Sequence, residues 1–280
     1  MKKKELSRKL SVVVCSKNEE KIIEKCLRSI VSNKPDEIIV VDGGSTDDTL
    51  KIARKYNTKI FTNKNSNLTN DRQIGLDKAK NNFVAMIDCD HFLKPNQLQK
   101  LLNELIKKNY AIIGAQLKIQ SIDFWTNLEK KSLDISHNIP GLKKIIGTAP
   151  NIYDKSKLKK IKFDSRITKT IDDTDYFYRL SKNNIRFGIA ETRVLSYHEK
   201  GFSKFFKKFI WYGKGDAEFC YKYKLKFFSM FFHLLIRYPI IYPLKSLTKF
   251  NFTPIIFFIL QGSVRFISMI FNLFRLYLKI

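Results

Sequence analysis

The sequence predicts an α/β protein whose sheet is mixed but mostly parallel and flanked by helices, and three observations support this prediction. Short apolar runs alternate with helical patterns four times within the first 90 residues, as expected of strands that pair in parallel through helical crossovers. The run at residues 83–87 is apolar throughout, which is typical of a strand buried on both faces. Polar residues follow the runs at residues 10–15, 37–41 and 83–87. Because parallel strands end at one edge of a sheet, these polar residues are expected to meet there.

The expected elements follow one another with short connections. Strands are predicted at residues 10–15, 37–41, 59–62, 83–87, 110–120 and 186–194, and helices at residues 22–31, 50–53, 68–79, 95–108 and 172–183. Pro95 is expected to open its helix. Residues 121–147 lose both periods and are interpreted as an active-site flap or an acceptor loop. Three regions result: a basic N-terminal tail at 1–9, an α/β domain at 10–200, and a basic, apolar helical tail at 201–280.

Composition narrows the class of protein. The chain has 280 residues, 44% of them hydrophobic, and a formal net charge of +26. Such a composition supports a packed core, and the charge predicts attraction to nucleic acid, an anionic membrane leaflet or phosphorylated substrates. Four scattered cysteines without C-x-x-C spacing argue against a zinc site or a disulfide framework and fit a reducing compartment. The apolar run after the basic N-terminus is too short for a signal peptide, so a cytosolic tail is expected.

Asp88 and Asp90 follow the apolar strand at residues 83–87 directly. Ligands of parallel sheets bind just beyond the carboxyl ends of the strands. Two carboxylates in that position suit a divalent cation with oxygen ligands, Mg²⁺ or Mn²⁺, shared with a phosphate. The alternative is that both aspartates only form a turn and cap the next helix.

Three strand ends are expected to lie at this edge: residues 16–19, 42–45 and 88–90. Gly43 and Gly44 allow the backbone to approach a ligand closely, and Asp42 can accept a hydrogen bond from a base or a ribose. Neither G-x-G-x-x-G nor G-x-x-x-x-G-K-[ST] occurs, which counts against dinucleotide binding and P-loop NTPase chemistry.

Five short motifs, in order and at similar spacing, resemble family 2 glycosyltransferases with the GT-A fold. They are residues 11–20 (SVVVCSKNEE), 40–49 (VVDGGSTDDT), 71–76 (DRQIGL), 88–90 (DCD) and 172–175 (DDTD) with Arg179 and Leu180 after it. Tyr197-His198 and the later residues 212–215 (YGKG) resemble a segment of membrane-associated members. The resemblance covers residues 10 to about 215.

The resemblance implies a role for each matching residue. Ser16 and Glu19 would line the nucleotide-sugar site, Asp42 would hold the base, Arg72 the base or diphosphate, Asp88 the ribose, Asp90 the metal, His198 a further metal or phosphate contact, and Asp173 the acceptor proton. Two positions depart from the family pattern. Asp172 stands where a Glu is usual, and Gly43 stands where many members carry a second Asp, which affects how the base is held.

The chemistry implied by the resemblance is an inverting sugar transfer. A divalent ion and Arg72 can stabilise the charge that develops on the leaving diphosphate. The acceptor hydroxyl attacks from the opposite face, so one carboxylate base suffices. Each residue also has a structural alternative. Asp172 and Asp173 can be helix caps, Arg72 a surface residue and His198 a packed histidine, while Asp47 and Asp48 are assigned to capping alone.

The tail predicts a membrane surface. Phe202, Phe205, Phe206, Phe209 and Ile210 share one helical face with lysines beside it, as in a basic amphipathic helix at an anionic surface; a helix docked on the catalytic domain is the alternative. Residues 227–242 are apolar but interrupted, and residues 250–264 are uncharged over a stretch shorter than the roughly 18 residues of a spanning helix.

A polar stripe crosses the last helix. Its members are spaced three or four residues apart: Gln261, Arg265, Ser268, Asn272, Arg275 and Lys279. A helix with one polar stripe lies in a membrane interface or packs against partner helices. We expect this stripe to face lipid headgroups, with the helix in the plane of the membrane and both ends on the cytosolic side; a spanning helix is the alternative.

These observations together predict an inverting, metal-dependent glycosyltransferase using Mg²⁺ or Mn²⁺. Its expected partners are a nucleotide-sugar donor, a lipid-linked or glycan acceptor and the cytosolic face of the cell membrane, where it is peripheral, monotopic or anchored by its C-terminal helices. A nucleotidyltransferase that makes an activated sugar is the enzymatic alternative, but the Gly-rich nucleotide loop it would need is absent. The non-enzyme alternative is a basic protein that binds nucleic acid or a membrane surface. It lacks a recognition motif and leaves the strand-end aspartates unexplained, so nucleic acid is not an expected partner.

Overall fold

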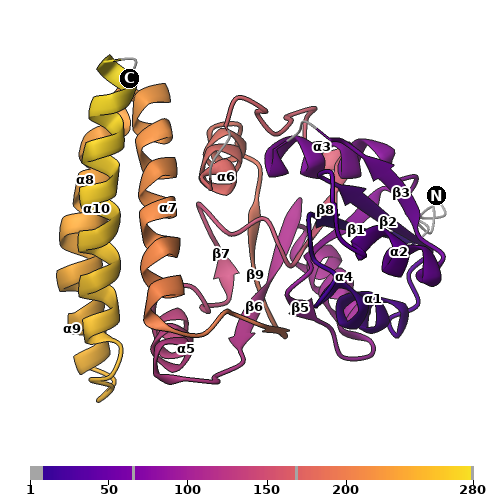
Figure 1. The fold of residues 1–280 in the computed structure, drawn as a ribbon, viewed down its shortest axis with the longest axis horizontal. Coiled ribbons are helices and arrows are strands. Elements are labelled where there is room, and N and C mark those ends of the chain that lie inside the picture. The colour runs from indigo at the N-terminus through magenta and orange to yellow at the C-terminus, as the bar shows by residue number, and fades with distance from the viewer. Residues whose placement is uncertain (1–8, 65–66, 168–169, 279–280) are drawn as a thin grey trace. The chain divides into compact units, whose positions relative to one another are not determined.

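The computed structural model describes residues 9–64, 67–167 and 170–278. Two compact units are present (Figure 1). The first comprises Met1–Ala115, Gly141–Phe163 and Phe177–Val194, and the second comprises Gln116–Pro140, Asp164–Tyr176 and Leu195–Ile280. Each unit therefore combines segments that are far apart in the sequence.

A mixed, mostly parallel sheet with flanking helices forms the first unit, as predicted. Its order is β3-β2-β1-β4-β8-β6-β9-β5, with β7 paired to β9. The strands are β1 (Leu10–Ser16), β2 (Glu37–Asp42), β3 (Lys59–Thr62), β4 (Phe83–Asp88), β5 (His91–Phe92), β6 (Ile112–Ile119), β7 (Gly141–Leu142), β8 (Asn151–Asp154) and β9 (Phe187–Ser196). β1 pairs in parallel with β2 and β4, and β8 is antiparallel to β4 and β6.

The helices of the first unit cover this sheet. They are α1 (Ile23–Val31), α2 (Thr49–Ala53), η1 (Arg54–Tyr56), α3 (Leu68–Lys78), α4 (Gln97–Lys108), η2 (Lys155–Lys157) and the later part of α6 (Asp172–Lys182). α3 packs so closely on β1 that a Cβ atom on Gly75 would lie 2.2 Å from Cγ1 of Val13. Every residue of β1 and β2 is buried. These strands, which were predicted from apolar runs in the sequence, therefore form the centre of the core.

The structure corrects two local predictions in this part of the chain. Pro95 does not open α4, because Asn96 adopts a left-handed conformation with φ of 65° and the helix begins at Gln97. Residues 121–147 are not an irregular flap, since they contain α5 (Phe124–Ser136) and β7. A capping box starts α5: the Asp123 carboxylate accepts from the Thr126 N–H at 2.8 Å, and the Thr126 hydroxyl accepts from the Asp123 N–H.

Helices dominate the second unit. After α5 come α7 (Phe202–Lys222), η3 (Lys224–Lys226), α8 (Phe227–Phe232), the π-helical η4 (His233–Ile241), α9 (Tyr242–Leu247) and α10 (Ile255–Leu278). α7 and α10 lie side by side (Figure 1). They run parallel, because Phe205 near the start of α7 contacts Phe257, and Tyr221 near its end contacts Tyr277.

The prediction that the polar stripe of α10 faces headgroups is wrong for its central residues. Arg265 pairs with Asp216 of α7 through two contacts of 2.8 and 2.9 Å. The Ser268 hydroxyl donates to the Ile210 carbonyl of α7 at 2.7 Å. These central residues therefore lie on the face on which α10 packs against its neighbours, together with the buried apolar residues Phe257, Phe258 and Met269. Other apolar residues of α10, such as Ile267 and Phe271, are exposed.

Two stretches of the described chain, Lys224–Leu247 and Ile255–Leu278, are each long and apolar enough to cross a membrane by length and composition. Burial inside the protein accounts for only 22% of the first and 39% of the second, measured over the most apolar window of each. Both stretches thus keep most of their apolar surface uncovered by the rest of the chain.

Candidate functional site at the carboxyl ends of the parallel strands

Three neighbouring strands of the first unit end side by side, as predicted. Ser16 is in register with Asp42, and Cys15 is in register with Asp88. The residues expected at the edge of the sheet, from 16–19, 42–45 and 88–90, therefore lie at one edge.

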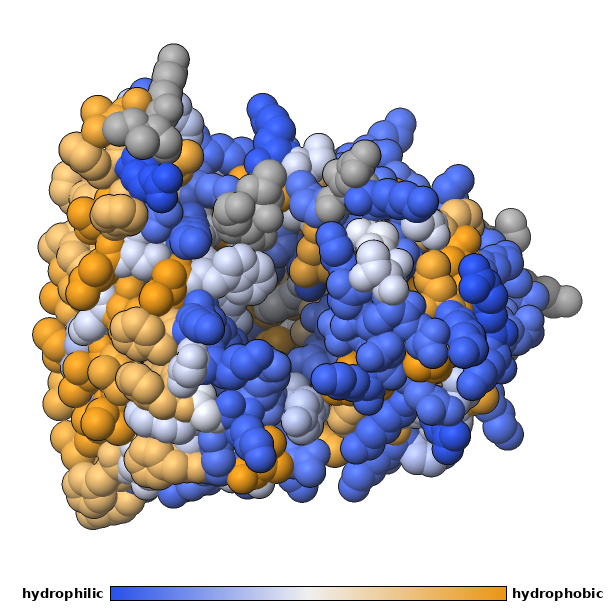
Figure 2. Space-filling view, viewed as in Figure 1, coloured by the Kyte–Doolittle hydropathy of each residue, from blue (hydrophilic) through white to orange (hydrophobic). Residues whose placement is uncertain are grey.

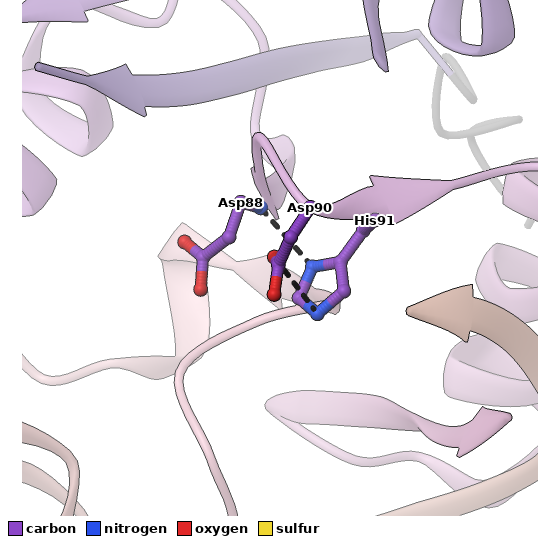
Figure 3. A group of neighbouring side chains, drawn as sticks. All are labelled: Asp88, Asp90 and His91. Atoms are coloured by element: carbon purple, nitrogen blue, oxygen red, sulfur yellow. Dashed lines mark hydrogen bonds and ion pairs between the residues drawn. The ribbon is translucent and has the colours of Figure 1, made fainter. Parts of the chain in front are cut away.

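Asp88, Asp90 and His91 form a compact group at the end of β4 (Figure 3). One ligand atom from each lies within 4.8 Å of the others. Nδ1 of the buried His91 accepts a hydrogen bond from the Asp88 N–H at 3.2 Å. This places the ring proton on Nε2, which lies 3.7 Å from an Asp90 carboxylate oxygen. In this arrangement His91 orients the turn, and the two carboxylates remain as candidate metal ligands.

The donor set fits a divalent cation of the Mg²⁺ or Mn²⁺ type. The Asp88 and Asp90 side chains are partly exposed, at 34% and 39% of their full surface. Hard cations of this kind are held by one or two carboxylates together with substrate phosphates. The chain supplies two carboxylates and leaves them accessible, so the remaining coordination positions suit a diphosphate.

Arg72 lies beside this pair. It is buried in α3, and its guanidinium group lies 3.5 Å from both Asp88 carboxylate oxygens. The helix that carries it begins at an Asn67 cap, whose side chain accepts from the Asn70 N–H at 3.0 Å. The sequence prediction that Arg72 and Asp88 share a site is consistent with this geometry, and burial argues against a surface residue.

Asp42 is fully buried, and its carboxylate caps the turn that follows β2. It accepts from the N–H groups of Gly44 and Ser45 at 3.0 and 3.1 Å and from the Ser45 hydroxyl at 2.5 Å. Gly44 adopts a φ of 89°, which favours glycine. Asp42 therefore shapes this turn, and its contact with a nucleotide base stays a prediction.

Gly43, which stands where many family members carry a second aspartate, lies close to the side chains of Asp71 and Lys17. A Cβ atom at this position would lie 3.3 Å from an Asp71 carboxylate oxygen and 3.4 Å from the Lys17 side chain. A second aspartate here would bring two carboxylates together. Asp71 is buried and accepts a hydrogen bond from the Asn63 side chain at 3.3 Å. Asp71 opens the motif at residues 71–76, but the sequence alone predicted no role for it.

Ser16 and Glu19 continue the same edge. The Ser16 side chain is buried, and its hydroxyl has no hydrogen-bond partner in the described part of the chain. The Glu19 carbonyl accepts from the Ile22 and Ile23 N–H groups at 3.0 and 2.9 Å, so this residue also starts α1.

Two thiols report the electrostatic character of this edge. Burial raises the pKa of Cys26, and the negative charges of Asp90, Asp88 and Glu19 raise it further. Burial likewise raises the pKa of Cys89, with Cys26, Glu19 and Asp88 adding to it. Neither cysteine forms a disulfide, and neither does Cys15 or Cys220. Asp88 and Glu19 therefore act on both thiols, which shows that these carboxylates of the strand-end edge lie near one another.

The second unit holds the remaining predicted residues, Asp173 and His198. Asp173 lies in the first turn of α6, where its carboxylate accepts from the Thr174 N–H at 2.5 Å. Asp175, two residues after Asp173, is buried and ion-paired with Lys222 at 2.5 Å. Lys222 also binds Asp164 at 2.7 Å. These ion pairs tie the start of α6 to the end of α7.

His198 belongs to a charged cluster that sequence reasoning missed. Its Nδ1 lies 2.9 Å from the Glu129 carboxylate of α5, and Lys208 of α7 lies 2.6 Å from the same carboxylate. Burial alone would raise the pKa of Glu129, but Lys208 and His198 outweigh it and lower the pKa from 4.5 to about 2. The sequence signal that could have indicated a role for Glu129 is the capping box of Asp123 and Thr126, because it marks the start of the helix at residues 124–136.

The family model for glycosyl transferase family 2 matches residues 11–167, more than half of the chain. The chain belongs to this family. The strand-end residues described above, from Ser16 to Asp90, all lie within the matched range.

Two relatives are similar to parts of this chain. The chain is 32% identical over 139 residues to the cholesterol galactosyltransferase of Borreliella burgdorferi, covering 47% of this chain and 38% of that protein. It is 29% identical over 226 residues to the hyaluronan synthase of Pasteurella multocida, covering 76% of this chain and 22% of that protein. The glycosyltransferase described here thus spans well under two thirds of these relatives.

Solved structures share the GT-A fold. TarS of S. aureus (residues 1–349) is 20% identical, with a TM-score of 0.53, and the match covers 72% of this chain and 63% of that chain. GalNAc-T7, solved with UDP, GalNAc and Mn²⁺, is 16% identical, with a TM-score of 0.55, and the match covers 68% of this chain and 44% of that chain. Both likenesses concern the fold.

Proposed function

We propose that this glycosyltransferase moves a sugar from a nucleotide-sugar donor to a lipid-linked or glycan acceptor, with inversion at the anomeric carbon and with the help of Mg²⁺ or Mn²⁺. The observation that carries the proposal is the pair Asp88 and Asp90 at the end of β4, partly exposed and beside the buried Arg72. Structural neighbours bound to UDP, UDP-GlcNAc, and UDP with GalNAc and Mn²⁺ support a nucleotide-sugar donor.

The donor would occupy the strand-end edge of the first unit. Asp42 and the glycine turn after it would face the base, Asp88 the ribose, and Ser16 and Glu19 the remaining donor surface. Asp90, with Asp88, would hold the divalent cation, which when bound supplies positive charge to the leaving diphosphate. Arg72 would share that task, because its guanidinium group already lies against Asp88 at 3.5 Å.

The acceptor hydroxyl would lose its proton to Asp173. One carboxylate suffices when the hydroxyl attacks the face of the sugar opposite the leaving group, and the anomeric centre is then inverted. Asp173 stands at the start of α6, where the helix dipole stabilises the anion and weakens it as a base. The proton therefore moves late, after attack has made the hydroxyl acidic.

His198 is proposed as a further metal or phosphate contact. Glu129 supports this role because it lies 2.9 Å from Nδ1 of His198. A carboxylate partner on Nδ1 places the ring proton there and leaves Nε2 as an acceptor, as in many metal-binding histidines.

The enzyme is proposed to work at the cytosolic face of the cell membrane, attached through its C-terminal helices. The two long apolar stretches at Lys224–Leu247 and Ile255–Leu278 support attachment. A membrane location brings a lipid-linked acceptor to the enzyme.

A panel of nucleotide-sugars tests the proposal. Release of nucleoside diphosphate is measured for each donor with Mg²⁺ or Mn²⁺, with excess chelator, and with membrane lipid as the acceptor source. We expect one donor or a few to be turned over, and only with the cation. Asp90→Ala should abolish release, whereas Asp48→Asn should not, since Asp48 is an exposed carboxylate that contacts Lys51 at the surface. Release of nucleoside diphosphate that persists in chelator would disprove the metal assignment. Consumption of a nucleoside triphosphate with release of pyrophosphate would indicate a nucleotidyltransferase instead.

A further inference from the structure

The outward side of the C-terminal helices carries an apolar face, formed by the exposed apolar side chains between residues 225 and 278. Its most exposed members include Leu225, Phe228, Phe250, Ile267, Phe271 and Phe274, whose exposed fractions range from 61% to 94%. Figure 2 shows this face as a continuous hydrophobic area over α8 to α10. Exposed apolar surface of this extent usually marks a binding site for another molecule.

The rest of α10 packs on α7 and η4, through the central residues of the polar stripe and through buried apolar residues such as Phe257 and Met269. Arg265 is paired with the fully buried Asp216, and Ser268 donates to a carbonyl of α7. A Cβ atom on Gly213 of α7 would lie 2.5 Å from the Arg265 carbonyl oxygen, so the two helices touch backbone to backbone. α10 is therefore fixed on α7 and η4, and its remaining side is free for lipid.

This pairing bears on whether α10 can cross a bilayer. Contacts run from Phe205–Phe257 at one end to Tyr221–Tyr277 at the other, so α7 accompanies α10 along nearly its whole length. α7 carries exposed charges at Lys204, Lys207 and Lys214. A spanning α10 would draw these charges into the hydrocarbon, where a charged side chain is costly.

Charge identifies the occupant of the apolar face. Residues 219–280 contain nine Lys or Arg residues and no Asp or Glu. Lys222 and Arg265 are paired with aspartates inside the protein, so the other seven supply the basic charge. A second copy of this chain would bring a like-charged surface to the contact, and a nucleic acid would leave the apolar side chains uncovered. An anionic bilayer satisfies both features, because its headgroups attract the basic residues and its acyl chains receive the apolar ones.

We propose that the apolar face lies in the plane of an anionic leaflet, with the axis of α10 along the membrane surface and α7 on the side of α10 away from the lipid. This inference rests on the proposed membrane attachment and adds its geometry. Arg265 then stays with Asp216 inside the protein. The loop at residues 248–254 and the end of α10 both remain on the cytosolic side.

Vesicle flotation tests the face. The purified full chain is mixed with vesicles of phosphatidylcholine alone or with added phosphatidylserine. We expect binding to require phosphatidylserine. Ile267→Asp should weaken binding by about tenfold or more, because an Ile side chain that would be buried in lipid is replaced by a charged one. Ile106→Asp is the matched control, since Ile106 is an exposed apolar residue of α4, at 40%, and should bind as wild type does. A thermal melt for each variant confirms that it folds.

Cysteine labelling tests the orientation. Lys249→Cys and Arg275→Cys are introduced singly and labelled with an impermeant maleimide in inside-out and right-side-out membrane vesicles. The four native cysteines are buried, so the background is set by the wild-type chain. We expect both positions to react in inside-out vesicles and neither in right-side-out vesicles.

Three outcomes would overturn the inference. Reaction of position 249 only in right-side-out vesicles would show that the apolar stretches at Lys224–Leu247 and Ile255–Leu278 cross the membrane. Equal binding by Ile267→Asp and wild type would show that the face does not contact lipid. A change in oligomeric state without a change in flotation would assign the face to a second copy. All three readouts are independent of turnover, so nucleoside diphosphate release can persist if this inference fails, and flotation can persist if the proposed transfer fails.

Discussion

Replacing Asp216 with Ala removes the partner of a buried guanidinium group and should strongly destabilise the helical unit. Asp216 is fully buried and binds Arg265 through two contacts of 2.8 and 2.9 Å, while the Arg265 side chain is only 12% exposed. Removing one partner of such a pair costs about 3–5 kcal/mol, because a buried charge is left uncompensated. The Tyr238 hydroxyl lies 3.4 Å from Arg265 and cannot replace a carboxylate, since it carries no charge.

Urea unfolding in mild detergent measures this loss. With an m-value of about 2 kcal/mol/M, a loss of about 3 kcal/mol moves the midpoint down by about 1.5 M. The double variant Asp216→Leu/Arg265→Met removes both charges and should recover most of the stability, because a buried ion pair replaced by apolar side chains is often neutral. Glu199→Ala is the control, since Glu199 pairs with Lys204 at 2.9 Å on the surface and should change stability by under about 1 kcal/mol. A midpoint for Asp216→Ala that equals that of Glu199→Ala would refute the buried pairing of α7 with α10.

Three further predictions concern the base, the charged cluster and the core. Asp173→Asn should keep nucleotide-sugar binding, measured by calorimetry, and lose transfer by several orders of magnitude; equal loss of donor binding would make Asp173 a structural cap. Because Lys208 and His198, opposed by burial, lower the pKa of Glu129 from 4.5 to about 2, its carboxylate stabilises the fold above about pH 4.5, and this contribution is lost as the pH falls toward 2. The stability difference between wild type and Glu129→Gln in urea should therefore shrink between pH 7 and pH 3, and a constant difference would contradict the ion pairing. Gly75→Ala should lower the free energy of unfolding by about 1–3 kcal/mol, because the added methyl group overpacks against Val13. Gly147→Ala is the control and should be tolerated, since its Cβ would meet only the Ala149 carbonyl oxygen at 3.7 Å. Equal urea midpoints for the two variants would contradict the close approach of α3 to β1.

The strand-end site could be predicted because its cause is local in sequence. The apolar runs that form β1, β2 and β4 each stop at a polar residue, and parallel pairing then brings Ser16, Asp42 and Asp88 to one edge. Nothing in this step depends on distant side chains. The placement of Arg72 in the same site as Asp88 was expected only from the family resemblance, since a lone arginine in a helical pattern does not reveal what it faces.

Helix α5 was missed because its sequence has weak apolar periodicity. Two of its four buried positions are Thr126 and Ser132, which do not register as an apolar stripe. The helix depends on its capping box and on partners in the C-terminal helices, such as Phe202 and Phe205, which contact Trp125. Glu129, and with it the support for His198, was missed for the same reason.

The polar stripe of α10 was found but placed on the wrong side. The spacing of Gln261, Arg265 and Ser268 shows that they share a face, but spacing alone cannot distinguish water from a buried partner. The partner, Asp216, lies 49 residues away in sequence. Two acidic residues, Asp216 and Glu218, on a helix that is otherwise basic were the available signal. Asp216 becomes informative only when it is paired with a buried arginine.

The cation-assisted diphosphate site at the end of β4 is tested most directly by calorimetric titration of UDP, with and without Mn²⁺, into wild type, Asp90→Ala and the control Asp48→Asn. If Asp88 and Asp90 hold the cation that meets the diphosphate, UDP binds wild type and Asp48→Asn only when Mn²⁺ is present, and Asp90→Ala shows no gain on adding Mn²⁺. Tight UDP binding by wild type in excess chelator, or an unchanged Mn²⁺ effect in Asp90→Ala, would contradict this account of the site.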